Sequence, residues 1–124
     1  MNYLIDTNIL IWFFNNDPQL PTSFKSIIED ETNVIYVSVA SIWEICIKNS
    51  IGKLDLSKPF EEIFPDYLER HSFEILQINV FHLQKLNKLQ FYHNDPFDRI
   101  IVSQVLTENV EFLYTDEFLK KYME

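Results

Sequence analysis

The stretch Tyr3-Leu4-Ile5-Asp6-Thr7-Asn8 decides the fold class that we expect for this chain. Three apolar or aromatic residues lead into an aspartate, and the segment from Ile9 to Phe14 that follows is entirely apolar. This pattern predicts a short buried strand that ends at Asp6, a tight turn, and a helix that begins near Thr7. In an open parallel sheet, ligands bind beyond the carboxyl ends of the strands. Asp6 is therefore either a helix cap or one wall of an active site, depending on where the other acidic residues lie.

Strands and helices alternate in the rest of the predicted pattern. Runs of β-branched and aromatic residues indicate strands, and capped amphipathic runs indicate helices between them. Further strands are expected at 34–37, 73–78 and 111–115, and helices at 7–14, 21–31, 38–50, 59–71, 80–89 and 96–109, with a last one from residue 116. Pro65 should kink or split the helix at 59–71. The alternation predicts an α/β fold, with a parallel sheet of four or five strands between two layers of helices.

Length and composition limit the possible classes of protein. At 124 residues, 47% of them apolar, we expect one globular domain that spans residues 1–124. The sequence contains no apolar run of the roughly 20 residues that a membrane span needs, and no signal peptide, so we expect no membrane partner and a cytoplasmic location. The lone Cys46 excludes an internal disulfide. Because it lies in a helical pattern without an activating histidine, we expect it to be a small buried hydrophobic residue.

The net charge of −9 argues against general binding of nucleic acid, because an acidic chain repels a polyanion at long range. A cluster of carboxylates that holds divalent cations would remove this objection locally.

Four acidic residues are expected near one edge of the sheet. Asp6 and Asp116 follow the first and last strands, Glu44 comes less than two helical turns after the second strand, and Asp98 lies in the first turn of a later helix. Carboxylates gathered in one cleft raise one another's pKa unless a cation binds them. Oxygen donors without a Cys/His cluster favour Mg²⁺ or Mn²⁺ over Zn²⁺. Such a site suits the hydrolysis of phosphodiester bonds, because the cations stabilise phosphate oxygens and activate water.

Each acid also has a purely structural alternative. These alternatives are N-caps for Asp6 and Asp116, a cap pair for Asp95 with Asp98, and an ion pair for Glu44 with Lys48. Two details favour a site. Asp98 shares a helical face with the apolar Ile101, Val102 and Val105, and Glu44 shares one with the small residues Ala40 and Ser41.

Several motifs resemble those of PIN-domain proteins, and more narrowly those of VapC-type toxin ribonucleases. In chain order they are Leu4-Ile5-Asp6-Thr7-Asn8, Ser38-x5-Glu44, Asp95-Pro96-Phe97-Asp98-Arg99 and Thr115-Asp116, so the resemblance covers almost the whole chain. The second motif continues as Ser41-x-Trp43-Glu44-Ile45-x-Ile47-Lys48, which is specific to one branch of the family.

The resemblance implies a metal-dependent endoribonuclease in which Asp6, Glu44, Asp98 and Asp116 form the catalytic and metal-binding set. It also implies Mg²⁺ or Mn²⁺ as cofactor, RNA as substrate, a homodimer and a cognate antitoxin protein. The family usually has a hydroxyl residue two positions before its last acid, where this chain has Tyr114. Glu117 is therefore a rival for the fourth acidic role.

Other residues near these motifs have open roles. The apolar surplus at Ile9 to Phe14 could form a dimer or antitoxin surface. Lysines at 48, 53 and 58 are expected near the mouth of the site, either on RNA phosphates or simply in solvent. His93 is given no catalytic role, because water activated by a metal needs no imidazole, whereas Arg99 could contact phosphate or a structural carboxylate.

Two other functions compete with a ribonuclease. A catalytically weak PIN-like module that binds RNA or protein would keep the fold without metal dependence. An aspartate-based phosphotransfer domain would use Asp6 as a phosphorylated nucleophile, but the second aspartate that one such class has two residues later is missing.

Overall fold

Four parallel strands form the sheet of this protein, for which the computed structural model describes residues 1–124. The strands are β1 (Asn2–Ile5), β2 (Val34–Ser38), β3 (Phe73–Leu76) and β4 (Glu111–Leu113), in the spatial order β3-β2-β1-β4. Ile5 pairs with Val37 on one side and with Leu113 on the other. The carboxyl ends of the strands therefore lie at one edge, as the alternation of strands and helices predicts for a parallel sheet.

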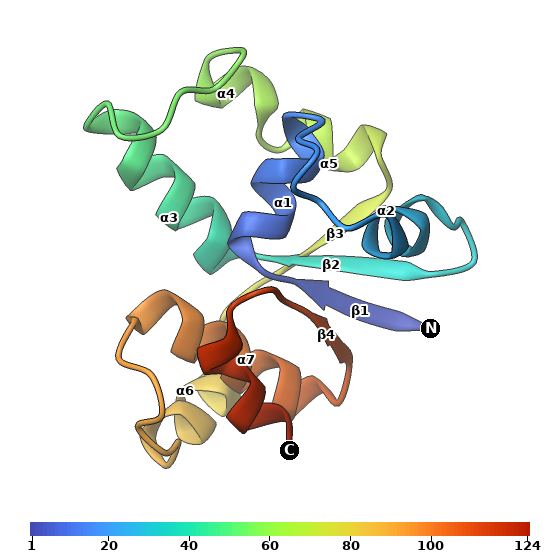
Figure 1. Cartoon of the computed structure of the whole chain (residues 1–124). Helices are drawn as coiled ribbons and strands as arrows, with labels where there is room; N and C mark the ends of the chain where they lie inside the picture. The colour runs from blue at the N-terminus through green and yellow to red at the C-terminus, as the bar shows by residue number, and fades with distance from the viewer.

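Helices cover both faces of this sheet (Figure 1). They are α1 (Thr7–Phe14), α2 (Thr22–Glu29), α3 (Val39–Ser50), α4 (Phe60–Ile63), α5 (Asp66–Arg70), α6 (Val80–Asn87), α7 (Pro96–Glu108) and the 3₁₀-helix η1 (Glu117–Met123). In Figure 1, α1, α2, α4 and α5 lie on one side, and α6, α7 and η1 lie on the other. The predicted three-layer α/β/α arrangement is confirmed. No helix is long and apolar enough to cross a membrane.

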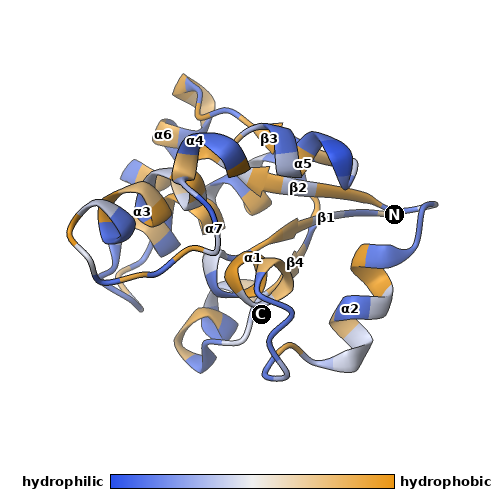
Figure 2. Cartoon of the chain, turned by 90° about the horizontal axis from the view of Figure 1, so that it is seen from above, coloured by the Kyte–Doolittle hydropathy of each residue, from blue (hydrophilic) through white to orange (hydrophobic).

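The two faces of the sheet bury separate hydrophobic clusters, because successive side chains of a strand point in opposite directions. Ile5 belongs to the cluster beneath α1 and α5, whereas its neighbour Leu4 packs with Ile101 of α7 and Leu119 of η1. All four side chains are almost completely buried. In Figure 2, β1 and β2 are accordingly orange along much of their length, while the helices carry both colours. The sheet is therefore held on both faces, and its edge residues are fixed.

Each strand that leads into a helix does so through a polar cap. The side chains of Asp6, Ser38 and Asp116 accept hydrogen bonds from backbone N–H groups of Ile9, Ala40 and Phe118, at 2.8, 3.0 and 2.9 Å. Such caps satisfy donors that have no partner inside the helix. The polar residues that follow the strands thus fix where each helix begins, and with it the direction in which its first turn faces.

Several predicted boundaries differ from the observed ones. β3 ends at Leu76 and β4 at Leu113, two residues earlier than predicted in each case. The helix at 59–71 is split at Pro65 into α4 and α5, as predicted, whereas the last helix is 3₁₀. The shorter strands leave a short extended segment before Asp116, and this segment carries the acid toward the sheet edge.

One expectation about burial is wrong, and another holds in part. Cys46 is exposed, because Ile45 faces the core and the next position on a helix is turned by about 100° away from it. The apolar surplus of α1 is only partly used inside the fold, because residues 11–14 are half-buried. The Phe13 ring packs edge-on against Phe73 at 5.6 Å, and the Phe14 ring packs against Tyr67 at 4.8 Å. These side chains join α1 to α5 and β3, so they are used inside the fold.

Candidate active site

Asp6 lies at the centre of the acidic edge and is only 4% exposed. Its Oδ1 accepts the backbone N–H of Ile9 at 2.8 Å, and its Oδ2 faces the backbone N–H of Thr115 at 3.4 Å. The pKa of Asp6 is raised to about 7, mainly by burial and in addition by the charges of Asp98 and Asp116, while the two N–H donors oppose the shift. The carboxyl group is therefore held in place but is costly to ionise without a compensating cation.

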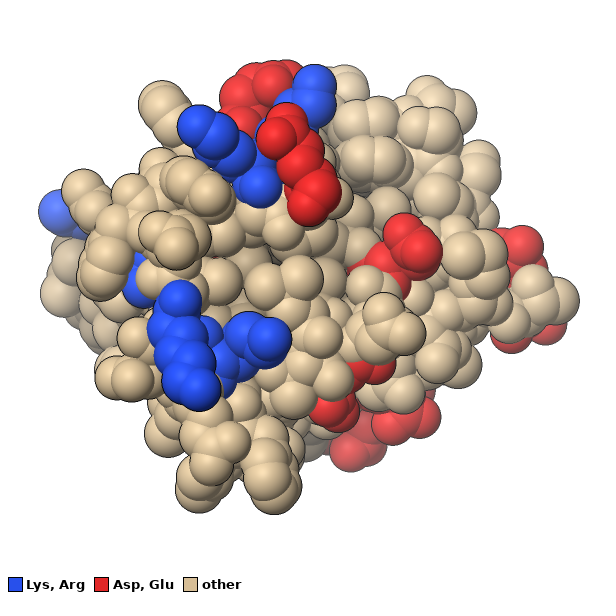
Figure 3. Space-filling model, turned by 90° about the horizontal axis from the view of Figure 1, so that it is seen from below, with Lys and Arg blue, Asp and Glu red and all other residues tan.

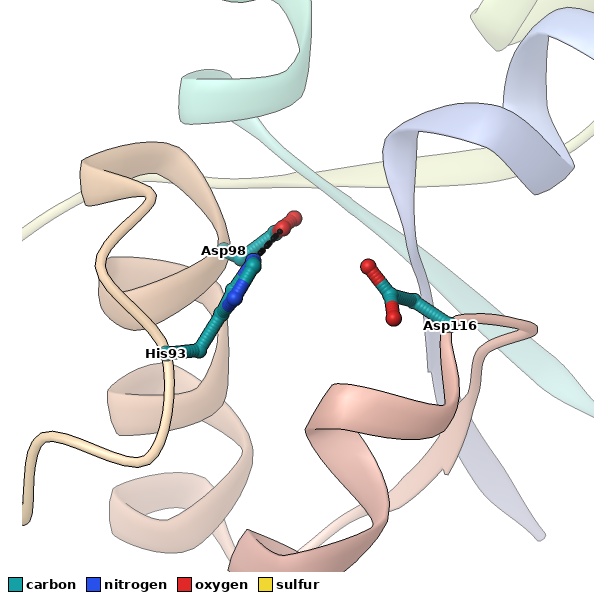
Figure 4. Close-up of side chains that lie close together, drawn as sticks. All are labelled: His93, Asp98 and Asp116. Carbon is teal, nitrogen blue, oxygen red and sulfur yellow. Dashed lines mark hydrogen bonds and ion pairs between the residues drawn. The ribbon is translucent and has the colours of Figure 1, made fainter.

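Asp98 projects from the first turn of α7 toward the same edge (Figure 4). Its Oδ2 lies 2.9 Å from Nε2 of His93, and with a proton on Nε2 the imidazole donates to the carboxylate. Burial is the largest cause that raises the pKa of Asp98, and the charges of Asp95 and Glu44 raise it too, while His93 opposes them. Asp98 thus shares the unfavourable environment of Asp6.

Asp116 faces this pair from the turn before η1 (Figure 4). One ligand atom from each of His93, Asp98 and Asp116 lies within 4.8 Å of the other two. Octahedral cations bind oxygen at about 2.1 Å, so opposite ligands stand about 4.2 Å apart, and only a small contraction would bring these three atoms onto one ion. Carboxylate oxygens with one imidazole nitrogen are a donor set that fits a divalent cation such as Mn²⁺ or Mg²⁺.

Glu44 lies at the margin of this group and has an ion-pair partner of its own. It is 9% exposed, and its Oε2 is 2.8 Å from Nζ of Lys48, one turn later on α3. Glu44 is close enough to raise the pKa of Asp98. The structural alternative for Glu44 is therefore present in the molecule, and a role on a cation would need this ion pair to open or to be shared.

The structure brings Asp98 and Asp116 within 4.8 Å of each other, places Asp6 near enough for both charges to raise its pKa, and leaves Glu44 beside Asp98 in an ion pair with Lys48. The two acids whose roles were open are also placed. Asp95 is the N-cap of α7, with its Oδ1 accepting the N–H of Asp98 at 3.0 Å. Glu117 is exposed and lies outside the cluster, so the geometry favours Asp116 over it.

Arg99 does not lie on the acids, contrary to the role considered for it. It is 6% exposed, and its guanidinium donates to the carbonyl of Gln90 at 2.9 Å and to that of Leu89 at 3.3 Å. Its Nη1 also donates to the Tyr122 hydroxyl at 3.2 Å, and its Cζ lies 3.8 Å from the centre of the Phe91 ring. Because the next residue on a helix points about 100° away, Arg99 is directed from Asp98 toward the loop before α7, which it holds closed.

Sequence reasoning gave His93 no catalytic role and did not predict its contact with Asp98. Its position five residues before Asp98, next to the turn that starts α7, was a signal that the two side chains could meet. The Phe118 ring lies nearly parallel to the imidazole, at 3° and 5.8 Å between centres. His93 is thus held between the loop, α7 and η1.

A wide hollow of the surface lies elsewhere. It encloses about 550 Å³ and is lined at the amino ends of β2 and β3 by Asn33, Ile35 and Ser72, with Asp30 and Arg70 at its rim. Ligands of parallel sheets bind at the opposite edge. We therefore centre the site on the acidic residues.

The model of the PIN domain family matches residues 3–123 of this chain. The chain belongs to the PIN domain family. This chain is also similar in structure to a chain of VapBC2 from Rickettsia felis, which was solved bound to a DNA fragment from the VapBC2 promoter. The TM-score is 0.70 at 18% sequence identity, over 98% of this chain and 92% of that one, which shows that the fold is shared. Comparison with curated protein sequences found no match.

Proposed function

We propose that this PIN domain is a metal-dependent endoribonuclease of the VapC type, the toxin of a toxin–antitoxin pair, and that residues 1–124 act as one domain. The observation that carries the proposal is the convergence of Asp6, Asp98 and Asp116 on one edge of the sheet, with the pKa of the buried Asp6 raised to about 7. Carboxylates so placed are costly without a cation and are well placed to bind one. The similarity to VapBC2 supports the VapC assignment.

The acids have distinct roles in this proposal. Asp6, fixed by two backbone N–H groups, and Asp98, oriented by the Asp95 cap and by His93, would hold the cation together with Asp116. Mg²⁺ or Mn²⁺, when bound, supplies charge that stabilises the scissile phosphate and promotes attack by water. Glu44 would complete the set, or accept a proton from the attacking water, once it leaves Lys48.

The charge of the chain limits how RNA would bind. On the face shown in Figure 3, Lys and Arg side chains form separate small groups and do not form a continuous band. A net charge of −9 gives little general attraction for phosphates. We therefore propose that the substrate phosphate is held mainly by the cation, with Lys48, which is 2.8 Å from Glu44, as the nearest positive side chain.

Two protein partners complete the proposal. On α3, Trp43, Ile47 and Ile51 repeat every four residues and are 59%, 37% and 59% exposed, so they form one apolar stripe that suits a homodimer. The outer residues of α1 are apolar and half-buried, among them Ile11, Trp12 and Phe14. We propose that an antitoxin segment lies over them and places an Arg or Lys on the acids.

The ion pair of Glu44 with Lys48 favours a second candidate. If that pair persists when metal and RNA are present, the site keeps only three acids, and the chain would be a catalytically weak module that binds RNA or protein.

Cleavage of a fluorogenic single-stranded RNA in the presence of Mg²⁺ or Mn²⁺ tests the proposal. Asp116→Asn should lower the rate by at least about a hundredfold, because loss of a ligand removes several kcal/mol of transition-state stabilisation. Glu117→Gln is the matched control and should cleave as the wild type does, since Glu117 is exposed outside the cluster. If the wild type binds RNA but does not cleave it with either metal, the binding module replaces the nuclease.

A further inference from the structure

We propose that His93 is a ligand of the divalent cation and makes this site prefer Mn²⁺ to Mg²⁺. The inference rests on the metal site of the proposed function and adds a nitrogen donor to its carboxylates. It concerns an imidazole that Figure 4 shows between the loop before α7 and the carboxylate of Asp98.

The spacing of the donor atoms fits direct ligation. His93 Nε2 is 2.9 Å from Asp98 Oδ2, and neighbouring ligands of an octahedral ion with bonds of about 2.1 Å are separated by about 3.0 Å. A carboxylate oxygen of Asp116 lies within 4.8 Å of a ring nitrogen of His93 and of a carboxylate oxygen of Asp98. The same two atoms that share a proton without metal can therefore share a cation, with Nε2 releasing its proton and the neutral imidazole carrying the remaining one on Nδ1.

His93 is held at this position by contacts that do not involve the acids. Its backbone N–H donates to the hydroxyl of Tyr122 at 3.1 Å, and its carbonyl oxygen accepts from Nη1 of Arg99 at 3.4 Å. Its ring lies parallel to that of Phe118. The Tyr122 hydroxyl and the Arg99 guanidinium also bind the carbonyl of Gln90, at 2.6 and 2.9 Å, so the whole loop is fixed. The imidazole is thus presented to the acids in advance, as a metal ligand requires.

A nitrogen donor changes which ion the site selects. Mg²⁺ strongly prefers oxygen ligands and keeps several waters, whereas Mn²⁺ accepts imidazole beside carboxylates. A site made only of Asp6, Asp98, Asp116 and Glu44 would distinguish the two ions weakly. With His93 included, the same site should bind Mn²⁺ more tightly.

Pulsed electron paramagnetic resonance of the full chain loaded with Mn²⁺ tests the ligation directly. The wild-type spectrum should show modulation from a coupled imidazole nitrogen, and His93→Gln should abolish it. Glutamine is chosen because its amide can still donate to Asp98, so it retains a positioning role but not the imidazole. His71→Gln is the matched control, because His71 is exposed beyond α5, on the far side of the molecule, and the modulation should persist in that variant. Absence of nitrogen modulation in the wild type, which requires no variant to fold, would overturn the proposal.

Calorimetric titration with each metal gives a second readout. His93→Gln should weaken Mn²⁺ binding by at least about tenfold and Mg²⁺ binding by less than about threefold, so that the preference for Mn²⁺ is lost. If His93→Gln weakens the binding of the two ions equally, or binds both as tightly as the wild type does, His93 only positions Asp98. None of these measurements uses RNA. If the wild type shows nitrogen modulation but cleaves no RNA, the nuclease proposal fails and ligation by His93 stands. If the wild type cleaves RNA but shows no nitrogen modulation, ligation by His93 fails and the nuclease proposal stands.

Discussion

At the scale of single residues, Asp6 shows that a cap and a site acid can be the same side chain. One carboxylate oxygen accepts the N–H of Ile9 and so starts α1, while the other faces the N–H of Thr115 and ties the end of β1 to the segment after β4. The two donors orient the carboxyl group, and burial makes its charge costly. The sequence left open whether Asp6 is a helix cap or a residue of the site. In the structure it is placed for both roles.

The raised pKa of Asp6 makes stability depend on pH. The folded chain keeps the Asp6 proton up to about pH 7, whereas the unfolded chain loses it near the ordinary value of 3.8. Stability without metal therefore falls as pH rises through this window, and the full penalty is present above it. Asp6→Asn should be more stable than the wild type by about 1–3 kcal/mol at pH 8, and the difference should shrink toward pH 4.

Urea unfolding of both proteins in chelator, at a series of pH values, measures this difference. Addition of Mn²⁺ should stabilise the wild type and not the variant, because only the intact site binds the ion well. A difference between the two proteins that does not change with pH would show that Asp6 ionises normally.

Glu44 and Lys48 form the other pair that a substitution can separate. Glu44→Gln should lower RNA cleavage by at least about tenfold, because an amide is a poor cation ligand and cannot accept a proton. Lys48→Ala should cost less and act mainly on the salt dependence of RNA affinity. Rates and binding curves at several salt concentrations test this. Small and equal losses would mean that Glu44 serves only as the partner of Lys48 on the surface of α3.

At the scale of secondary structure, the regular elements could be predicted from the sequence better than the irregular segments between them. Hydrophobic periodicity and caps placed β1, α1, α3 and α7 correctly, since local pattern determines them. The closeness of Asp6 to Asp116 also followed from the parallel order of the strands, whereas Asp98 follows α6 and no strand, so this rule does not place it. The loop at 89–93 could not be predicted, because a buried Arg99 and the Tyr122 hydroxyl, 23 residues apart, fix it through backbone carbonyls. For the same reason the contact of His93 with Asp98 was not foreseen.

The Tyr122 hydroxyl should therefore stabilise the fold from near the carboxyl end of the chain. Tyr122→Phe removes bonds to the N–H of His93 and to the carbonyl of Gln90, and should cost about 1–2 kcal/mol because these partly buried groups lose a partner. Tyr114→Phe is the control, since Tyr114 packs on the same hydrophobic cluster without a hydrogen bond from its hydroxyl. Urea unfolding measures both changes, and equal losses for the two variants would contradict this role of the hydroxyl.

At the scale of the whole molecule, the acidic charge and the separate apolar surfaces suit a nuclease that a partner controls. The apolar stripe lies on α3 and the half-buried apolar residues Ile11, Trp12 and Phe14 lie on α1, so a second copy and an antitoxin have different helices to bind. Part of the surplus at Ile9 to Phe14 is used in internal packing, with Phe13 against Phe73. The rest is the surface that the helix pattern singles out for a partner.

Expression in bacterial cells tests control by a partner. The wild type expressed alone should arrest growth, Asp6→Asn should not, and co-expression of the neighbouring gene should restore growth if it encodes the antitoxin. The reason is that a positive side chain from the partner would displace the cation from the acids. Wild-type expression without any effect on growth would contradict the toxin proposal.

The central claim is that Asp98 and its neighbours hold a cation that enables hydrolysis of RNA. Its most direct test is the single-turnover cleavage rate of a short single-stranded RNA, for wild type and Asp98→Asn, in Mn²⁺ and in chelator. We expect the wild type to cleave only with Mn²⁺, and the variant to be slower by at least about a hundredfold while it keeps the wild-type fold by circular dichroism. A variant that cleaves at the wild-type rate, or a wild type that is equally active in chelator, would contradict the claim.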